Sequence, residues 1–377
     1  MASLRVGLVL YGLDRPLSGV TRYAEGLGGA LPCQPDCEVV HLTTYRHGPF
    51  TGHGSRSWYL PGCSRLPLLM LLGGPALALA ARVLRLDLIH DPTGVTPFTL
   101  GHWAGRFKRI TTIHDAIAFR YPKGYPWLNN FLHRRFVPAV LPNVDACTTV
   151  SEHARKDLMH YLALPPSNIH VVPSAVGDEF RPLADTETAD VLRSYDIKSP
   201  YVLSLGSQQE RKNVRGILEA FVEVHRRAPQ YSLVITGPTQ WGHQSLTSVV
   251  DQLGLSAAVN VIGYVPSEHL PALYSGASAF VFPSLYEGFG LPPLEAMACG
   301  TPVVCSNTTS LPEVTGDAAI HVDPRDPNQL AEAILDALLN EHLRASLRER
   351  GLDRARHYTW RATASKSLAV YRKVLAA

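Results

Sequence analysis

Short apolar runs alternate with longer, helix-length segments along most of this 377-residue chain, and this alternation limits the folds open to it. An apolar run of about four to eight residues is typical of a strand that is buried on both faces. Where such runs alternate with helical patterns, the expected fold is α/β, a parallel sheet with helices on both faces. The expected strands are 5–11, 39–43, 86–90, 109–114, 146–150, 170–172, 201–205, 232–236, 259–262, 279–282, 302–305 and 319–321.

A stretch rich in Pro, Asp and Thr, residues 173–200, divides these runs into two sets. At roughly 100–200 residues per domain, the length also suggests two domains. We therefore predict two doubly wound parallel-sheet domains joined near residues 175–200, with ligands at the carboxyl ends of the strands. The expected helices include 20–31, 125–141, 213–227, 267–275, 294–299, 328–340 and, after the second sheet, 360–375.

The overall charge is small, with 35 Lys+Arg against 32 Asp+Glu and a net charge of +3. A dedicated nucleic-acid-binding protein carries a strong basic excess, so this balance argues against nucleic acid as a partner. The halves differ: residues 1–175 hold 17 basic and 10 acidic side chains, and residues 176–377 hold 18 and 22. A basic first half suits docking on anionic lipid or on a phosphate-bearing acceptor. The basic residues expected on this side include Arg106, Lys108, Arg109, Arg134 and Arg135.

The six cysteines form no C-x-x-C pair, and none lies beside a histidine at the spacing of zinc ligands. We predict buried free thiols in a reducing cytosol, and so a cytoplasmic protein. The N-terminal apolar run is too short for a secretory signal, and we expect it to be the first strand.

Residues 66–81 are the one membrane-like stretch, a run of sixteen residues without a charged side chain. A membrane span needs about 20 apolar residues, and two prolines and two glycines interrupt this shorter run. We favour a buried helix hairpin over the alternative, a surface that rests on a bilayer. Three arginines flank the stretch: Arg65, Arg82 and Arg85.

Three common motifs are missing from the sequence. The segment after the first expected strand lacks the G-x-G-x-x-G of dinucleotide-binding folds, and no G-x-x-x-x-G-K-[ST] occurs anywhere. The G-x-S-x-G of α/β-hydrolases is also missing. These observations exclude a typical dinucleotide-binding enzyme, a P-loop NTPase and an ordinary α/β-hydrolase.

The most informative run, residues 282–300, reads Phe-Pro-Ser-Leu-Tyr-Glu-Gly-Phe-Gly-Leu-Pro-Pro-Leu-Glu-Ala-Met-Ala-Cys-Gly. A buried strand is expected to end near its start, and a glycine-rich turn follows. The paired prolines then suit the first positions of a helix, whose N-terminus we expect at residues 293–294. Such an N-terminus is a ready site for a phosphate, and the glycines allow a ligand to approach the backbone closely.

Glu287 and Glu295 lie on either side of that turn. Carboxylates at a phosphate site would repel the ligand unless they bind hydroxyl groups, so we assign them to sugar and ribose hydroxyls. The alternative is an ordinary strand-loop-helix joint with solvated glutamates.

Arg211 and Lys212 follow another expected strand and stand at an expected helix start. Cations there oppose the helix dipole at a cost of roughly a few tenths of a kcal/mol each. A bound diphosphate would reverse that cost, and the two cations would stabilise a pyrophosphate leaving group. The alternative is a solvated surface pair.

Taken together, these motifs closely resemble the family-4 retaining glycosyltransferases over nearly the whole chain. Glu287-x7-Glu295 resembles the family's signature, residues 206–213 its Arg-Lys-Asn phosphate loop, and residues 149–152 its interdomain strand end. Ile113-His114-Asp115 resembles its His-Asp element, and the Phe-Arg-Tyr-Pro of residues 119–122 is most like the mannosyltransferase branch. Two positions depart from the pattern, since Ser18 replaces one of two paired glycines and Ser174-Ala175 stands where many members have Asn-Gly.

The resemblance implies a GT-B architecture, with two Rossmann-like domains facing a central cleft. Residues 1–175 would bind the acceptor and residues 176–358 the nucleotide-sugar donor. Residues 359–377 would form a helix that crosses back to the N-terminal domain.

The resemblance also implies roles for individual residues. His114 would lie by the anomeric centre and the sugar C6 hydroxyl, Glu287 would bind the donor sugar, and Glu295 the ribose. Arg211 and Lys212 would hold the phosphates, and together with His114 and Glu287 they form the expected catalytic set. The expected donor-binding residues are Gly19, Ser207, Arg211, Lys212, Val265, Gly288, Phe289, Gly290, Leu291 and Glu295.

The implied reaction retains the anomeric configuration and uses no metal or other cofactor, since the nucleotide-diphosphate sugar is a substrate. No D-x-D occurs, and the nearest candidate is Asp185-Thr186-Glu187. We favour front-face attack by the acceptor hydroxyl, with Asp115 positioning His114 or closing a loop instead of acting as nucleophile.

The donor and the acceptor are less constrained by the sequence. The Phe-Arg-Tyr-Pro resemblance favours GDP-mannose, with a UDP-sugar as the alternative, and the acceptor is expected to be a glycan or a lipid-linked intermediate. Peripheral contact with anionic membrane at the inner face of the cell membrane is then an option for the N-terminal domain. A sugar-nucleotide epimerase and a non-catalytic nucleotide-sugar-binding protein stay open as other functions.

Overall fold

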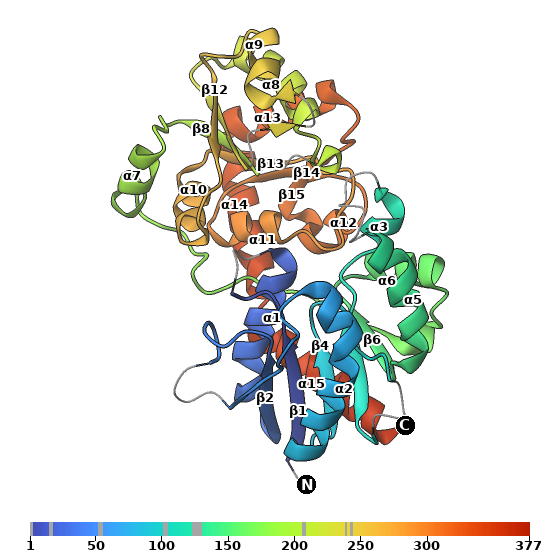
Figure 1. The fold of residues 1–377 in the computed structure, drawn as a ribbon. Helices are drawn as coiled ribbons and strands as arrows, with labels where there is room; N and C mark the ends of the chain where they lie inside the picture. The colour runs from blue at the N-terminus through green and yellow to red at the C-terminus, as the bar shows by residue number, and fades with distance from the viewer. Residues whose placement is uncertain are drawn as a thin grey trace. The chain divides into compact units, whose positions relative to one another are not determined.

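The structure, a computed structural model, describes residues 3–14, 18–51, 56–100, 105–122, 130–205, 209–237, 240–241 and 244–377. They form two compact units: unit 1 comprises residues 1–175 and 358–377, and unit 2 comprises residues 176–357. Each unit is built around its own parallel sheet, with helices on both faces (Figure 1). The predicted α/β class, with two parallel-sheet domains, is therefore confirmed.

The sheet of unit 1 has seven strands in the order β3-β2-β1-β4-β5-β6-β7, and all neighbours are parallel. The strand order reverses at β1, which has β2 on one side and β4 on the other. Ligands of such sheets bind outside the carboxyl ends of the strands at this reversal. The strands are β1 (Leu4–Leu10), β2 (Cys37–Thr43), β3 (Ser57–Tyr59), β4 (Leu88–Asp91), β5 (Lys108–Thr112), β6 (Ala146–Thr149) and β7 (Ile169–Val171).

Helices cover both faces of this sheet. One face carries a hydrophobic core shared with α2, α5 and α6, while α1 and α15 pack together elsewhere in the unit. The helices are α1 (Gly19–Ala30), α2 (Leu66–Leu84), α3 (Ile117–Arg120), α5 (Val137–Val140), α6 (Glu152–Leu162) and α15 (Trp360–Ala376). A π-helical turn, Leu132–Phe136, precedes α5, and residues 125–129 of the helix expected at 125–141 lie outside the described part of the chain.

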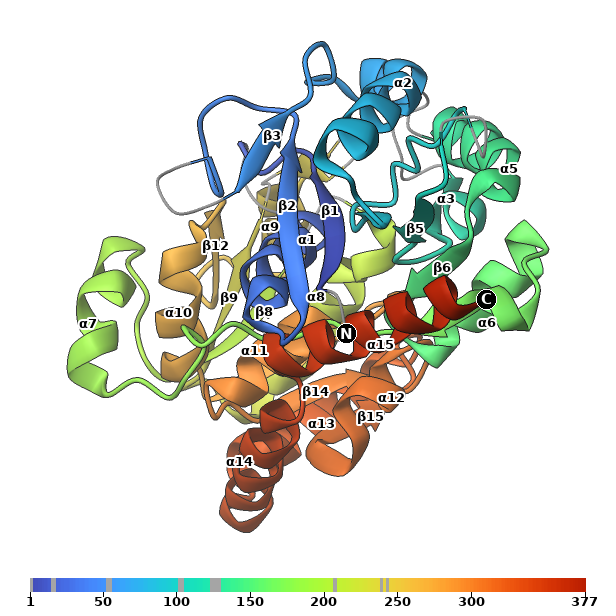
Figure 2. The ribbon, with the colours of Figure 1, turned by 90° about the horizontal axis from the view of Figure 1, so that it is seen from below.

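α15 belongs to unit 1 although it follows unit 2 in the sequence (Figure 2). The hydroxyl of Tyr371 lies 2.6 Å from Nδ1 of His90, which is fully buried at the end of β4. The hydroxyl of Thr363 donates to the carbonyl of Pro173 at 2.9 Å. At the other end of the helix, Trp360 packs so closely on Gly26 of α1 that a Cβ there would lie 2.1 Å from the indole ring.

The sheet of unit 2 has six strands in the order β12-β9-β8-β13-β14-β15, again all parallel. Its order reverses between β8 and β13. The strands are β8 (Tyr201–Leu205), β9 (Ser232–Thr236), β12 (Val259–Gly263), β13 (Ala279–Phe282), β14 (Val303–Ser306) and β15 (Ala319–Val322). A small antiparallel pair, β10 (Gln240–Trp241) and β11 (Gln244–Ser245), stands apart from the sheet.

The helices of unit 2 form two groups. α8 (Val214–Arg227), α9 (Leu246–Gln252) and α13 (Pro327–Leu339) share one hydrophobic core with the sheet. α10 (Leu270–Gly276) contacts both α7 (Asp185–Ser194) and α11 (Leu291–Ala298), and α11 also contacts α14 (Glu341–Arg356). The short α12 (Leu311–Thr315) follows β14.

Several local expectations are wrong. Residues 66–81 do not form a buried hairpin, because α2 runs as one continuous helix with an exposed face. The stretch 173–200, near which the two domains were expected to join, contains one helix that was not expected, α7. Among the cysteines Cys33 is exposed and Cys37 half-buried, while the other four are buried as expected.

Arg109 corrects the expected basic surface. Its side chain is 1% exposed and donates to the carbonyls of Phe107 and Gly105 at 2.9 and 3.0 Å. Lys108 lies 3.5 Å from the carboxylate of Asp145. Arg109 therefore stabilises the start of β5 and does not contribute to an anion-docking surface.

Candidate functional site

The first candidate site lies where the strand order of unit 2 reverses. β8 and β13 are neighbours there, and the chain leaves them through two segments, residues 209–212 and 283–290. The amide of Leu285 donates to the carbonyl of Arg211 at 2.7 Å, and the Ser284 hydroxyl oxygen lies 3.0 Å from the same carbonyl. These bonds join the two strand-end segments into one platform.

Glu287 is the centre of this platform. Arg211 Nη1 and Lys212 Nζ each donate to its Oε1 at 2.7 Å, and the Ser284 hydroxyl does so at 2.7 Å as well. The side chains of Arg211, Lys212 and Glu287 are only 16, 15 and 12% exposed. No described residue donates a hydrogen bond to the second oxygen, Oε2, so the carboxylate keeps an acceptor for a ligand hydroxyl.

Burial alone would raise the pKa of Glu287, because it penalises the charged form. Lys212 and Arg211 outweigh this effect, and the pKa of the carboxyl lies below its usual range. Glu287 is therefore ionised at neutral pH. The two cations are oriented by further contacts, since Arg211 Nε donates to Gln209 at 2.7 Å and Lys212 Nζ lies 4.5 Å from the centre of the Phe282 ring.

The turn after Glu287 is fixed from the neighbouring strand. The Ser310 hydroxyl shares its single proton between the carbonyls of Glu287 and Phe289, at 2.9 and 2.7 Å. Gly290 has φ 115°, which L side chains rarely adopt, and a Cβ there would lie 2.6 Å from Leu311 Cδ2. Glycine is required at this position by backbone conformation and packing.

α11 begins at Leu291, two residues earlier than expected, with Gly290 as its N-cap. Its prolines occupy positions that need no backbone donor, as predicted. Glu295 on this helix is 2% exposed and accepts a hydrogen bond from the Tyr274 hydroxyl at 2.9 Å. The carboxylate is thus held in a defined orientation below the turn.

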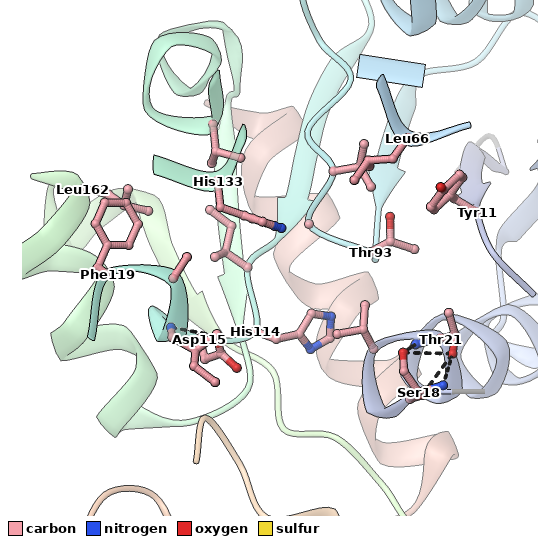
Figure 3. A pocket seen from close by; sticks show the side chains of 17 residues that line it. Tyr11, Ser18, Thr21, Leu66, Thr93, His114, Asp115, Phe119, His133 and Leu162 are labelled. Carbon is pink, nitrogen blue, oxygen red and sulfur yellow. Dashed lines mark hydrogen bonds between the residues drawn. The ribbon is translucent and has the colours of Figure 1, made fainter. Parts of the chain in front are cut away.

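A second candidate site is a cavity of about 300 Å³ in unit 1 (Figure 3). Its polar lining includes Ser18 and Thr21 from the start of α1, together with His114, Asp115 and His133. The rest of the lining is mostly apolar and includes Leu66, Phe119 and Leu162.

His114 follows β5 and has a defined hydrogen-bonding state. Its Nε2 lies 2.8 Å from the carbonyl of Pro92, and a carbonyl can only accept, so Nε2 carries the proton. Burial lowers the pKa of His114 and outweighs the opposing effects of that carbonyl and of Asp115 and Asp91. The ring is therefore neutral at pH 7, and its Nδ1 is the nitrogen that can accept a proton or a hydrogen bond.

Asp91 shapes the cavity without lining it. This fully buried carboxylate at the end of β4 accepts bonds from the amides of Thr93 and Thr96, at 2.9 and 2.7 Å, and from the Thr93 hydroxyl at 2.6 Å. The turn that it holds supplies Thr93 and Gly94 to the cavity wall. Sequence reasoning missed Asp91, although His90-Asp91 repeats the His114-Asp115 pattern at the end of the neighbouring strand.

The predicted site residues fall into two groups. Arg211, Lys212 and Glu287 are in direct contact, and Gly288, Phe289, Gly290, Leu291 and Glu295 continue from Glu287 into α11. Val265 is buried just after β12, and Ser207 lies outside the described residues. Gly19, the first residue of α1, belongs with His114 to unit 1.

Two side chains of unit 2 were missed by the sequence reasoning. Ser284 donates to the Glu287 carboxylate, and a Ser-x-x-Glu spacing directly after a strand is the signal that could have found it. Tyr274 orients Glu295 from α10, and because the two residues are 21 positions apart no local pattern connects them.

Two family models match the chain. The model described as Glycosyltransferase Family 4 matches residues 17–180, and the model described as Glycosyl transferases group 1 matches residues 192–354. Together they match the greater part of both units. These matches favour a transferase over the epimerase and the non-catalytic binding protein that the sequence left open.

Individual proteins agree with the family models. The chain is 34% identical to the O-antigen chain mannosyltransferase B of Escherichia coli, over 95% of this chain and 96% of that one. It is 30% identical to the serotype-specific mannosyltransferase WbdA of Escherichia coli, over 71% of this chain and 34% of that longer one. In structure it resembles the sucrose-phosphate synthase of Thermosynechococcus elongatus, with a TM-score of 0.76, 24% identity and 99% of each chain covered. The fold is GT-B, and the chain belongs to the group 1 and family 4 glycosyltransferases.

Proposed function

We propose that the chain is a mannosyltransferase that moves mannose from a nucleotide-diphosphate sugar to a glycan or lipid-linked acceptor. The observation that carries this proposal is the Arg211–Glu287–Lys212 cluster, at the strand-order reversal of a chain that matches a mannosyltransferase over 95% of its length. GDP-mannose is the favoured donor, and a UDP-sugar is the alternative.

In this proposal unit 2 holds the donor. Arg211 and Lys212 contact the diphosphate together with Ser207 and the segment Gly288–Leu291 at the start of α11, where the helix dipole favours negative charge. Glu287 accepts a hydroxyl of the donor sugar through Oε2. Glu295 binds the ribose hydroxyls, and the backbone around Val265 contacts the base.

Unit 1 contributes His114 and Gly19 to the donor sugar and the cavity to the acceptor. The proton arrangement of His114 supports a specific role. Since Nε2 already donates to Pro92, a neutral ring offers Nδ1 as an acceptor, which suits a sugar hydroxyl that donates. Asp115 accepts the amide of Ile117 at 2.9 Å and acts as a positioning residue.

The proposed transfer retains the anomeric configuration and needs no metal or other cofactor. The acceptor oxygen bonds to the anomeric carbon from the face that the diphosphate leaves, and the carbon–oxygen bond to the phosphate breaks. Its electron pair goes to the leaving phosphate, which also takes the acceptor's proton. Arg211 and Lys212 stabilise the growing negative charge, and each such donor is worth about 3 kcal/mol.

The proposed location is the cytoplasm, with peripheral contact at the inner face of the cell membrane. A lipid-linked acceptor requires an enzyme that works at that surface. Nucleic acid is not a proposed partner, because the net charge is only +3.

The test starts with a thermal-shift screen of sugar nucleotides, since a ligand of the native state stabilises it by about 2.7 kcal/mol at a hundredfold excess over Kd. GDP-mannose should raise the melting temperature, and transfer should persist in EDTA and give an α-linked product by NMR. Arg211→Ala with Lys212→Ala should abolish transfer, whereas Arg215→Ala, an exposed cation on the next helix turn, should not. Full activity of the double variant would contradict the proposal, and stabilisation by UDP-sugars alone would assign the alternative donor.

A further inference from the structure

One helix of unit 1 has two contrasting faces. The inner face of α2 is buried and contributes Leu69, Met70, Leu77, Ala80 and Ala81 to the core. Two glycines in the middle of that face bring the helix close to its neighbours, because a Cβ at Gly73 would lie 2.7 Å from Pro97 and one at Gly74 2.3 Å from Thr99. Within the described part of the chain, α2 is long and apolar enough to cross a bilayer, but these contacts bind it to a folded unit.

The outer face of α2 is exposed and almost wholly apolar. Leu71, Leu72, Leu79 and Val83 are 64, 50, 59 and 54% exposed, and Leu68 is 39% exposed. We call these five residues the α2 face. Soluble proteins rarely expose an apolar surface of this extent unless it meets a partner.

Arginines surround the α2 face. Arg65 is the N-cap of α2, Arg82 lies in its last turn, Arg85 is its C-cap, and Arg106 is exposed before β5. We call these four residues the arginine rim. No described carboxylate forms an ion pair with any of them.

A hollow lies beside the C-terminal half of α2. It has a volume of about 740 Å³, and its lining includes Arg82 and Arg106 together with the apolar side chains of Leu79, Leu100 and Phe107. One carboxylate, Asp87, also lines it and accepts a hydrogen bond from the amide of Arg5. Apolar walls beneath two cations match the acyl chain and the phosphate of an anionic phospholipid.

We propose that the α2 face and the arginine rim rest on an anionic lipid bilayer, with α2 lying in the plane of the interface. An apolar helix face flanked by cations is the pattern of interfacial helices, and the rim complements negative lipid headgroups. A second copy of the chain fits less well. A twofold interface would bring the same surface of each copy together and so place two unpaired arginine rims against each other.

This surface adjoins the proposed acceptor cavity. Leu66, the first residue of α2, lines the cavity that holds His114, and Leu68 of the α2 face follows two residues later (Figure 3). A bilayer under α2 would therefore lie next to that cavity. Resting on the proposed transferase function, this geometry assigns the acceptor to the class of glycans carried on a membrane lipid.

The test is flotation of the full chain with vesicles of phosphatidylcholine, or of phosphatidylcholine and phosphatidylglycerol in equal amounts. The chain should float with the anionic vesicles. Leu71→Gln with Leu72→Gln should weaken this binding by roughly tenfold for each leucine, because less apolar surface is inserted. Arg82→Gln with Arg106→Gln should weaken it by roughly fivefold for each arginine on anionic vesicles only.

Leu339→Gln is the matched control, since Leu339 is an exposed leucine (51%) on a helix of unit 2 and should float like the wild type. Glutamine is a good helix former, and unchanged circular dichroism will show that α2 is intact. A wild-type chain that stays in solution, or leucine variants that float normally, would overturn the proposal. A dimer seen in sedimentation velocity that the two leucine substitutions dissociate would also overturn it, because the α2 face would then be an interface between two copies of the chain.

Transfer to a water-soluble acceptor without vesicles separates the two proposals. The leucine variant should retain this activity in full and lose it selectively on a lipid-linked acceptor in vesicles. Equal activity of variant and wild type on the lipid-linked acceptor would overturn the docking surface alone. Absence of mannosyl transfer by a wild-type chain that still floats would overturn the proposed function alone.

Discussion

Glu287 holds a negative charge between two cations in a region almost closed to water. A buried charge that loses its counter-ion is costly, and removal of one partner of such a group typically destabilises a protein by about 3–5 kcal/mol. Since Glu287 compensates both Arg211 and Lys212, the fold of unit 2 depends on it before any donor binds.

We therefore expect Glu287→Gln to lower the free energy of unfolding of unit 2 by about 3 kcal/mol and to abolish transfer. Urea denaturation followed by hydrogen exchange in β8 and β13 measures the first effect. Glu332→Gln removes an exposed partner of Arg227 and should cost under about 1 kcal/mol. Equal free energies of unfolding for the two variants would show that contacts other than Glu287 hold Arg211 and Lys212 in place.

His90 gives unit 1 a different sensitivity to pH. Burial, with a smaller contribution from His114, lowers the pKa of His90 to about 3, far below the value near 6.5 in an unfolded chain. The unfolded state therefore binds the proton first as pH falls. The stability from this group is complete above pH ~6.5 and declines below it by about 1.4 kcal/mol per pH unit.

The expected result is that unit 1 weakens between about pH 6 and pH 4, a window in which ionised Glu287 still stabilises unit 2. Since the pKa of Glu287 is lowered, its contribution is lost only below about pH 4.5. Hydrogen exchange of the β4 amides, compared with that of the β13 amides at pH 7 and at pH 5, will measure this difference in stability between the units. His90→Gln should flatten the response of unit 1, and an unchanged response would assign it to another buried histidine.

At the scale of elements, the packing of α1 on α15 depends on a glycine. A Cβ at Gly26 would lie 2.1 Å from the Trp360 ring, whereas one at Gly29 of the same helix meets nothing within 4 Å. Gly26→Ala should therefore destabilise unit 1 by about 1–3 kcal/mol through overpacking. Gly29→Ala should stabilise it by about 0.5–1 kcal/mol, because alanine loses less backbone entropy in a helix. Thermal unfolding of both variants measures the difference, and equal shifts would contradict this packing.

Elements with a strong apolar pattern were predictable, and others were not. β8, β9 and β13 were expected within a residue of their bounds, because buried parallel strands are continuous apolar runs. α14 was missed, since just three of its sixteen residues are buried and it shows little apolar periodicity. α2 was misread because its two glycines suggest a break in the sequence, whereas in the fold they allow close contact with Pro97 and Thr99.

The candidate site, like the secondary structure, was predictable only in part. Residue types and spacing predicted Glu287, Arg211 and Lys212, because cations and carboxylates beside glycine-rich strand ends suit a sugar diphosphate. Their direct pairing was not predicted, since it depends on β8 and β13 being neighbours. Arg109 was misassigned for a related reason. Its guanidinium donates hydrogen bonds to the carbonyls of Phe107 and Gly105, just before β5, and composition does not reveal such bonds.

At the scale of the whole molecule, unit 1 is completed by residues that follow unit 2. Ala364, Leu368, Tyr371 and Val374 of α15 are all buried. Truncation after His357 should lower the free energy of unfolding of unit 1 by about 5 kcal/mol or more, since several large apolar contacts are lost together. Hydrogen exchange should rise in β1 and β4 while β8 and β13 stay protected.

Lys366→Ala, on the exposed side of α15, is the control for this truncation and should leave exchange unchanged. Equal loss of protection in both units would show that the units do not unfold separately.

The position of α15 also has a consequence for synthesis. On the ribosome unit 2 emerges complete, whereas the first 175 residues must wait through its translation for the helix that covers His90. Because the hydroxyl of Thr363 donates to the carbonyl of Pro173, α15 packs beside the residues at which the chain leaves unit 1 for unit 2. We therefore expect the central portion of the chain to complete its fold before unit 1, which lacks α15 until that helix is made.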